Sequence, residues 1–373
     1  MNGTFSRAYG SPMRYIQGPG EINNLKQHTL DLGSNAFILI DGFIFDSITA
    51  RLEKIFGDEV KFFAMKFGGE SSQEEVDRAI AKIREHGSDV VIGIGGGKTI
   101  DTIKLVANEV GLPRIIMPSS ASTDAPTAGL AGLYRPDGVQ IKAIKTRRNS
   151  ELVLLDTEII VNAPARLFAA GMGDALATWF EARANWNSCT PNYIGTGYRP
   201  TRAAMAIARE CSEILFEDGR NALAAVKKHI VTEEVENVVE ANTLLSGLGF
   251  ENTGCAAAHG IHAGLSEMDA DHKDHGFHGE KVAFSIMCLM VLENTPKEEM
   301  DKTIRFMLDI GLPVTLEQLN IEPTEENLAK IVDHTVNHNN LIHHEPLIIN
   351  EYVVKNAILA ANEIGHAYLN ERK

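Results

Sequence analysis

The sequence predicts an α/β fold in the first half of the chain and an all-α fold in the second. Before residue 160, short β-branched apolar runs alternate with amphipathic stretches, which is typical of a Rossmann-like sheet of parallel strands joined by crossover helices. After residue 163 the chain is rich in Ala, Leu, Glu and Met at helical spacing. We therefore expect two domains, 1–162 and 163–373.

Each predicted element of the first domain has its own local signal. Apolar runs bounded by Gly, Pro or polar residues predict strands at 36–40, 60–64, 89–94 and 114–117. Between them, apolar residues at helical spacing predict helices at 44–56, 73–86 and 99–108. The turn Pro136-Asp137-Gly138 predicts an antiparallel hairpin, 132–135 with 139–145, appended to the sheet. A further strand is predicted at 152–160.

Composition limits the class of protein. A chain of 373 residues with 44% hydrophobic residues is expected to fold into two globular domains, and its net charge of -15 argues against nucleic acid or anionic lipid as a partner. The cysteines form no Cys-x-x-Cys pair, so we expect reduced core residues at Cys189, Cys211, Cys255 and Cys288. Neither a signal-peptide core nor a long apolar run is present, which predicts a soluble cytoplasmic protein without membrane segments.

A glycine-rich loop joins the third predicted strand to the helix that follows it. Gly95, Gly96 and Gly97 precede Lys98 and Thr99, and a loop of this kind lets a phosphate approach the backbone at a helix amino terminus. The loop has neither the dinucleotide fingerprint G-x-G-x-x-G nor the spacing of a P-loop. The alternative is a tight turn that uses glycine only for its φ freedom.

Two other strand ends carry polar residues. Asp41 follows the first predicted strand, where a carboxylate can accept hydrogen bonds from the adenosine ribose and favour NAD over NADP; a turn or helix-capping role is the alternative. The Ser/Thr-rich segment 118–127 follows the fourth predicted strand. Its hydroxyls can bind phosphate or nicotinamide, and Asp124 can face substrate hydroxyls, although a plain loop is the alternative.

Histidines cluster in the second half of the chain. Five of the thirteen lie within twenty residues: His259, His262, His272, His275 and His278. Together with Asp174, which lies in a small apolar run, His259 and His278 can bind a metal ion and leave one coordination position free, as catalytic sites do. The alternative is a solvated His-rich loop that binds no metal.

Four segments together resemble a known family. They are 95–102 (GGGKTIDT), 121–126 (ASTDAP), 171–183 (GMGDALATWFEAR) and 278–284 (HGEKVAF). They are similar to segments of the glycerol dehydrogenases, the zinc-dependent branch of the iron-containing alcohol dehydrogenase superfamily, which has a dehydroquinate synthase-like fold. The resemblance extends over nearly the whole chain.

The resemblance implies roles for individual residues. It assigns the metal to Asp174, His259 and His278, the adenosine ribose to Asp41, and the glycerol hydroxyls to Asp124. It implies NAD contacts for the rest of the cofactor set: Gly95, Gly96, Gly97, Lys98, Asp101, Ser119, Ser122, Leu130 and Tyr134.

The remaining histidines have secondary roles in this interpretation. His262 lies three positions after His259, on about the same helix face, and is expected to orient the substrate, accept its proton or serve as a ligand instead. His275 is the alternative to His278, although only His278 precedes the Gly-Glu-Lys of the family motif. Surface or supporting positions are expected for His272, His343 and His344.

The predicted activity is the oxidation of glycerol and related vicinal diols to dihydroxyacetone or its analogues. Hydride would pass from the alkoxide on a divalent ion, expected to be Zn²⁺, to the nicotinamide of NAD. Alternatives are a related enzyme acting on a phosphorylated substrate, of the glycerol-1-phosphate dehydrogenase or dehydroquinate synthase type, and a non-catalytic module that binds NAD or zinc. The resemblance also implies a homo-oligomer, up to an octamer.

Overall fold

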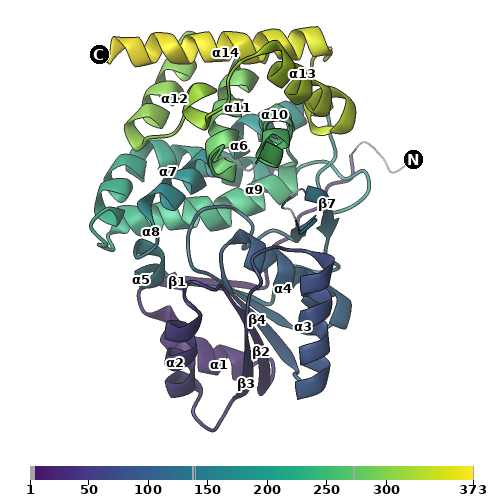
Figure 1. Cartoon of the computed structure of the whole chain (residues 1–373), viewed down its shortest axis with the longest axis vertical. Helices are drawn as coiled ribbons and strands as arrows, with labels where there is room; N and C mark the ends of the chain where they lie inside the picture. The colour runs from purple at the N-terminus through teal and green to yellow at the C-terminus, as the bar shows by residue number, and fades with distance from the viewer. Residues whose placement is uncertain (1–4, 137, 139, 272–273, 373) are drawn as a thin grey trace.

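A parallel sheet and a bundle of helices occupy opposite ends of the molecule (Figure 1). The structure is a computed structural model and describes residues 5–136, 138, 140–271 and 274–372. The sheet lies in the first half of the chain and the bundle in the second, as the sequence predicts. The predicted domain boundary at residue 162 falls between two helices, α5 (Thr157–Val161) and α6 (Ala165–Ser188), and the division into two domains stays a prediction.

The main sheet has six parallel strands in the order β1-β8-β5-β4-β2-β3. Their bounds are β1 (Arg14–Gly18), β2 (Asn35–Ile40), β3 (Lys61–Lys66), β4 (Val90–Gly95), β5 (Arg114–Pro118) and β8 (Leu152–Asp156). The crossover helices are α1 (Leu25–Leu30), α2 (Phe45–Phe56), α3 (Gln73–His86) and α4 (Gly97–Val110).

Both faces of the sheet are buried, which explains why the strands are continuous apolar runs. Along β2, Ile38 and Ile40 pack with α1 and α2 in one core cluster, whereas Phe37 and Leu39 pack with α3 and α4 in the other. Figure 1 shows the two pairs of helices on opposite sides of the sheet. The second cluster continues into the helical half, so the two halves share one core.

The structure corrects two expectations about the first half and adds one strand. The predicted strand 152–160 ends at Asp156, because this side chain accepts a hydrogen bond from the amide of Glu158 and caps α5. The predicted hairpin exists as β6 (Leu130–Tyr134) and β7 (Gln140–Lys145), but it forms a separate two-stranded sheet, and Asp137 in its turn lies outside the described residues. The edge strand β1, with the mixed sequence RYIQG, was not predicted.

The second half is helical, as predicted. Its longer helices after α6 are α7 (Arg202–Val226), α8 (Glu233–Glu240), α9 (Ser246–Thr253), α10 (Ala257–Ser266), α11 (His278–Leu292), α12 (Lys297–Ile310), α13 (Glu325–Asp333) and α14 (Glu351–Glu371). A π-helical turn, η2 (Ala241–Leu245), joins α8 to α9. Within the described ranges, no helix combines the length and the apolar character that a membrane span requires.

Three adjacent strands of the sheet deliver polar residues to the same edge. β5, β4 and β2 end at Pro118, Gly95 and Ile40, and the amides of Ser119 and Asp41 continue the ladder by donating to the carbonyls of Gly95 and Ile94. The helices after β2 and β4 cover opposite faces of the sheet, so their strand ends flank a topological switch point. Ligands of α/β sheets bind at such a point.

Glycines allow α6 and α11 to pack with their backbones in direct contact. A Cβ atom added to Gly279 would overlap the carbonyl oxygen of Ala170, and one added to Gly173 would overlap the carbonyl oxygen of Gly279. Gly171 allows the same close approach between α6 and the carbonyl of Ala121. The close backbone contacts of α6 with α11 and with the segment after β5 therefore require glycine at these positions.

We predict that Gly279→Ala lowers the free energy of unfolding by about 1–3 kcal/mol, because the methyl group must push α11 away from a backbone atom of α6. The measurement is chemical denaturation of the variant and of the wild-type protein. Gly18→Ala is the matched control, because a Cβ there would be 3.6 Å from its nearest neighbour, Cγ of Glu21. Equal stability of Gly279→Ala and wild type would show that the helices have room to spare.

Candidate active site

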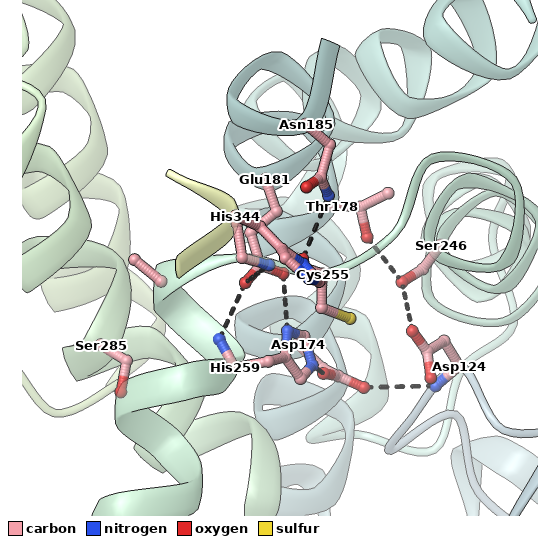
Figure 2. Close-up of polar contacts among 12 residues, drawn as sticks. Asp124, Asp174, Thr178, Glu181, Asn185, Ser246, Cys255, His259, Ser285 and His344 are labelled. Carbon is pink, nitrogen blue, oxygen red and sulfur yellow. Dashed lines mark hydrogen bonds and ion pairs between the residues drawn. The ribbon is translucent and has the colours of Figure 1, made fainter. Parts of the chain in front are cut away.

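One carboxylate and two imidazoles from three helices meet at the centre of the helical half. Oδ1 of Asp174 on α6 is 3.4 Å from Nε2 of His259 on α10 and 3.1 Å from Nε2 of His278 at the start of α11. The ligand atoms of these residues all lie within 4.8 Å of one another, and Figure 2 shows Asp174 beside His259. The structure thus brings together the three residues that the sequence predicts as metal ligands.

The three side chains differ in exposure, so the cluster has a closed and an open side. Asp174 is 1% exposed, whereas the side chain of His278 is 41% exposed. Burial alone raises the pKa of Asp174, but His278 and His259 more than offset this effect, and the net pKa lies well below its usual value. An ionised carboxylate and two imidazoles are suitable donors for a divalent ion, and three protein ligands leave a position for substrate.

Glu181, which the sequence analysis did not assign a role, holds His259 in place. Its Oε1 accepts hydrogen bonds from the amides of Ala256 and His259, both at 2.8 Å, at the amino terminus of α10. Its Oε2 lies 2.6 Å from Nδ1 of His259 (Figure 2). With the carboxylate as acceptor, Nδ1 carries the proton and the lone pair of Nε2 is directed toward Asp174. Glu181 lies seven positions after Asp174, on the same face of α6, and this spacing is the signal that could have identified it.

A second group of potential ligands lies on the other side of His259. Glu181, Cys255 and His259 also have donor atoms within 4.8 Å of one another. The Glu181 oxygens already accept three hydrogen bonds from α10, and burial raises the pKa of the Cys255 thiol to about 11. Because a thiolate is the ligand form of cysteine, this group is a support for His259 and not a second metal site.

Asp124 lies against the cluster on the side of the α/β half. Its amide donates to Oδ2 of Asp174 at 3.3 Å, and its own Oδ2 accepts from the hydroxyl of Ser246 at 3.2 Å. The Ser246 hydroxyl is 2.9 Å from that of Thr178, which completes a chain of polar groups (Figure 2). Burial, followed by repulsion from Asp174, raises the pKa of Asp124 to about 8. The sequence analysis assigned no role to Ser246 on α9 or Thr178 on α6, because both lie far along the chain from the segment that carries Asp124.

The other histidines take different positions. The His262 ring lies 4.2 Å from that of His278, and burial, with repulsion from His278 and His259, lowers its pKa well below the usual value. His275, the alternative ligand, is buried with its Nδ1 3.0 Å from the carbonyl of Leu319. His344 supports the cluster from outside, because its Nδ1 lies 2.7 Å from the carbonyl of Cys255. His343 lies near the surface, whereas His272 is outside the described residues.

The glycine loop forms an open cradle at the edge of the sheet. None of Gly95, Gly96 and Gly97 has a positive φ, so φ freedom does not explain them. A Cβ on Gly95 would be 2.7 Å from Oγ1 of Thr99 and 2.9 Å from Cβ of Asp41, whereas one on Gly96 or Gly97 would make only ordinary contacts of 3.4 Å or more. The amino terminus of α4 has no side-chain cap, so its amides can bind an anion. This cradle fits a pyrophosphate, with Asp41 adjacent to it.

The lysine and aspartate of the glycine motif have protein partners. Nζ of Lys98 is 2.5 Å from the carboxylate of Glu70 and 5.4 Å from the centre of the Tyr134 ring. Asp101 points inward, and its carboxylate accepts a hydrogen bond from the amide of Gly132. Both residues lie close to the cradle, and their predicted contacts with the cofactor stay predictions.

The segment 119–130 connects the cradle to the histidine cluster. It begins where the amide of Ser119 bonds to Gly95, and it reaches Asp174 through the amide of Asp124. Ser122 lies between these points, with its hydroxyl 3.1 Å from that of Ser120, and Leu130 begins β6 at the far end. Of the residues predicted to line the nicotinamide, Ser119 and Ser122 therefore lie, along the chain, between the contact with the cradle and the contact with Asp174, whereas Leu130 and Tyr134 begin and end β6.

One expectation about the cysteines is wrong in part. Cys211, Cys255 and Cys288 are free and buried, as predicted. Cys189 is free but exposed, because it ends α6 in the left-handed conformation with φ of 61°. This terminal position takes its side chain out of the core.

Known proteins resemble the chain over almost its whole length. Residues 12–157 match the family model of the iron-containing alcohol dehydrogenases. Glycerol dehydrogenase from Thermotoga maritima is 42% identical over 362 residues, which cover 96% of this chain and 98% of the relative. Glycolaldehyde reductase from Halobacterium salinarum is 38% identical over 359 residues, covering 96% of this chain and 97% of the relative.

The fold agrees with that of a solved structure. The crystal structure of a probable glycerol dehydrogenase from Sinorhizobium meliloti superimposes with a TM-score of 0.90 at 43% sequence identity, over 97% of this chain and 100% of that chain. Sequence and fold therefore agree along both halves of the molecule, and the chain belongs to the iron-containing alcohol dehydrogenase family, a family of oxidoreductases.

Proposed function

We propose that this chain oxidises glycerol and related vicinal diols to the corresponding hydroxyketones, with NAD as the hydride acceptor and one Zn²⁺ ion at Asp174, His259 and His278. The supporting observation is the meeting of these three side chains beside Asp124, on the segment that begins at the glycine cradle. The names of the relatives from Thermotoga maritima and Sinorhizobium meliloti point to the same substrate.

In the proposed reaction the metal ligands, Asp124 and His262 have different roles. A divalent ion at the three ligands supplies Lewis acidity, which lowers the pKa of a substrate hydroxyl. Asp124, supported by Ser246, accepts a hydrogen bond from a neighbouring hydroxyl of the diol and orients it. His262, which burial keeps neutral, would accept the hydroxyl proton at a ring nitrogen, and the carbon that bears this hydroxyl would give up its hydride to nicotinamide.

The cofactor half of the site has two binding elements. The amides of α4 and the space beside Gly96 and Gly97 receive the pyrophosphate of NAD. Asp41 accepts hydrogen bonds from the adenosine ribose and repels the 2′-phosphate of NADP. The segment 119–130 then places nicotinamide between the cradle and Asp174.

The charges around the site favour an uncharged substrate over a phosphorylated one. A site for a phosphate ester needs cations that are free to pair with it. Lys281, whose charge affects His262, is 3% exposed and donates to Asp269 at 2.6 Å. Lys98 is paired with Glu70. Free diols, and small hydroxycarbonyls in the reverse direction, as the name of the Halobacterium relative indicates, suit such surroundings.

The test of this function is NADH formation with glycerol, 1,2-propanediol and glycerol 1-phosphate, before and after chelation and after return of Zn²⁺. We expect activity with the two free diols, loss on chelation and recovery with zinc. Activity confined to the phosphorylated substrate would favour the phosphate-specific relatives, and NADH formation with none of them would favour a non-catalytic module. Assembly into a homo-oligomer, up to an octamer, and a cytoplasmic location stay predictions.

We predict that Asp174→Asn and His259→Ala abolish both zinc retention and diol oxidation, because each removes one of three ligands and the substrate loses its Lewis acid. Elemental analysis after dialysis and the NADH assay measure the two effects. His343→Ala, near the surface, is the control and should retain both. Wild-type turnover by either ligand variant, in a metal-free preparation, would refute the proposed centre.

We predict that Glu181→Gln weakens zinc binding by about 10- to 100-fold, the usual cost of losing a partner of a metal-binding histidine. The glutamine oxygen can still accept from the amides of α10, but its NH₂ group faces Nδ1 of His259 and favours the tautomer with a proton on Nε2. Competition with a chelator measures the affinity. Glu213→Gln, on the exposed side of α7, is the control, and equal zinc affinity in both variants would mean that Glu181 serves only α10.

We predict that Asp41→Asn raises KM for NAD by about 10- to 100-fold, because hydrogen bonds to a charged group contribute about 1.5–3 kcal/mol. It should also narrow the preference for NAD over NADP, since the repulsive charge is gone. Initial rates with each cofactor measure both effects. Asp46→Asn, in the first turn of α2, removes a nearby charge and should change neither. An unaltered cofactor preference in Asp41→Asn would assign this carboxylate to the turn, where it accepts from the amide of Phe43.

A further inference from the structure

A buried lysine on the cofactor helix has no role in the chemistry described above. Lys104 lies on α4, two turns after the glycine cradle, and its side chain is 0% exposed. Burying an ammonium group is costly unless other polar groups replace its water. Burial lowers the pKa of Lys104 to about 8, although Asp101 partly offsets this effect.

The groups that replace the water belong to the segment after β5. Nζ of Lys104 donates to the carbonyl of Leu130 at 2.7 Å and to the carbonyl of Ala125. It is 3.9 Å from the carboxylate of Asp101, one turn earlier on α4. Asp101 in turn accepts from the amide of Gly132. The pair thus connects one face of α4 to three points along 125–132.

These contact points adjoin the residues that the proposed reaction uses. Ala125 follows Asp124, the predicted contact of the diol, and Leu130 is a predicted contact of nicotinamide. Other bonds hold the same segment to the helical half: the Asp124 amide to Asp174 at 3.3 Å and the Thr127 hydroxyl to the carbonyl of Thr243 at 2.6 Å. Lys104 supplies the corresponding connection to the cofactor helix.

We propose that Lys104 is a positioning residue that fixes Asp124 and Leu130 relative to the cofactor end of α4. This inference rests on the proposed function, because it assumes that the diol and nicotinamide bind on either side of this segment. Lys104 does not touch either ligand in this arrangement. It acts through the two carbonyls, and the rigidity of the segment keeps the reacting carbon and nicotinamide at a constant separation.

The test is Lys104→Met, which keeps the aliphatic stem and removes the donors. We expect kcat with glycerol to fall by about 100-fold, the effect of a displacement of about 1 Å in a reactive geometry. Binding of ADP-ribose and of zinc should stay within about twofold of wild type, because neither the cradle nor the three ligands lie on the segment. Lys54→Met, on the exposed side of α2, is the control and should behave as wild type.

Two outcomes overturn the inference. One is wild-type kcat in folded Lys104→Met, and the other is an equal loss of ADP-ribose binding, zinc binding and turnover, which a general loss of packing would cause. If Lys104→Met does not fold, Lys104→Gln keeps an N–H donor on a shorter stem. In Lys104→Gln we expect amide hydrogen exchange to be faster in residues 119–132 than in the wild-type protein and to be unchanged in α6. Exchange at the wild-type rate in residues 119–132 would also overturn the inference. Absence of diol oxidation by the wild-type protein would instead reject the proposed function.

Discussion

The buried carboxylate of Asp174 is the constraint on which the rest of the site depends. At 1% exposure it has lost almost all contact with water, and its charge requires polar partners in compensation. The partners come from other elements: the imidazoles of α10 and α11, and the amide of Asp124. Glycines in α6 and α11 bring those backbones close enough for the contacts to form. The geometry of the cluster therefore depends on helix packing, because any side chain that moves α11 away from α6 also moves His278 away from Asp174.

The connection between β5 and β6 relates this cluster to the edge of the sheet. Transfer of hydride from the substrate to a nicotinamide ring requires the two reacting carbons to be held in alignment about 3–3.5 Å apart. In the proposed function the glycine cradle and the metal ligands lie in different halves of the chain. The segment 119–130 is bonded to the glycine loop, to α4 and to α6. In the proposed function, these hydrogen bonds along one continuous segment hold the two binding regions in a fixed relation to each other.

Much of the fold could be predicted because its signals are local. The apolar runs of β2 to β5 and the glycines of the loop are visible in a few consecutive residues, whereas β1 was missed because an edge strand with the sequence RYIQG has no such run. The metal ligands were different. The histidine cluster pointed to a metal site with Asp174 as a further ligand, but Asp174 and His278 are 104 positions apart, and the local pattern left a His-rich loop without metal as an alternative. The resemblance of motifs added support for the three predicted ligands. The sequence analysis did not identify Ser246 because its contact, with Asp124, joins two segments that are far apart in the chain. It did not identify Lys104 because a buried lysine in an amphipathic helix cannot be distinguished by sequence from an exposed one.

Stability alone does not account for the buried charges around this site. Replacing a buried ion pair by apolar groups of similar volume is often neutral or stabilising, so the pair Lys104 with Asp101 adds little net stability to the fold. Lys281 is also buried, but its partner Asp269 is half-exposed, and an ion pair with an exposed partner contributes little as well. Their contribution is to the orientation of the groups that they bind. The ammonium groups of Lys104 and Lys281 donate hydrogen bonds to acceptors of the protein, and these bonds fix the positions of the acceptors relative to the lysines. Because both groups are paired, neither presents an unpaired positive charge to the site. Asp174, whose pKa lies well below its usual value, then supplies the negative charge of the local field, whereas Asp124, with its pKa raised to about 8, is largely protonated near neutral pH. In the proposed function such a field favours hydrogen-bond donors without negative charge, such as the hydroxyls of a free polyol, over phosphate esters.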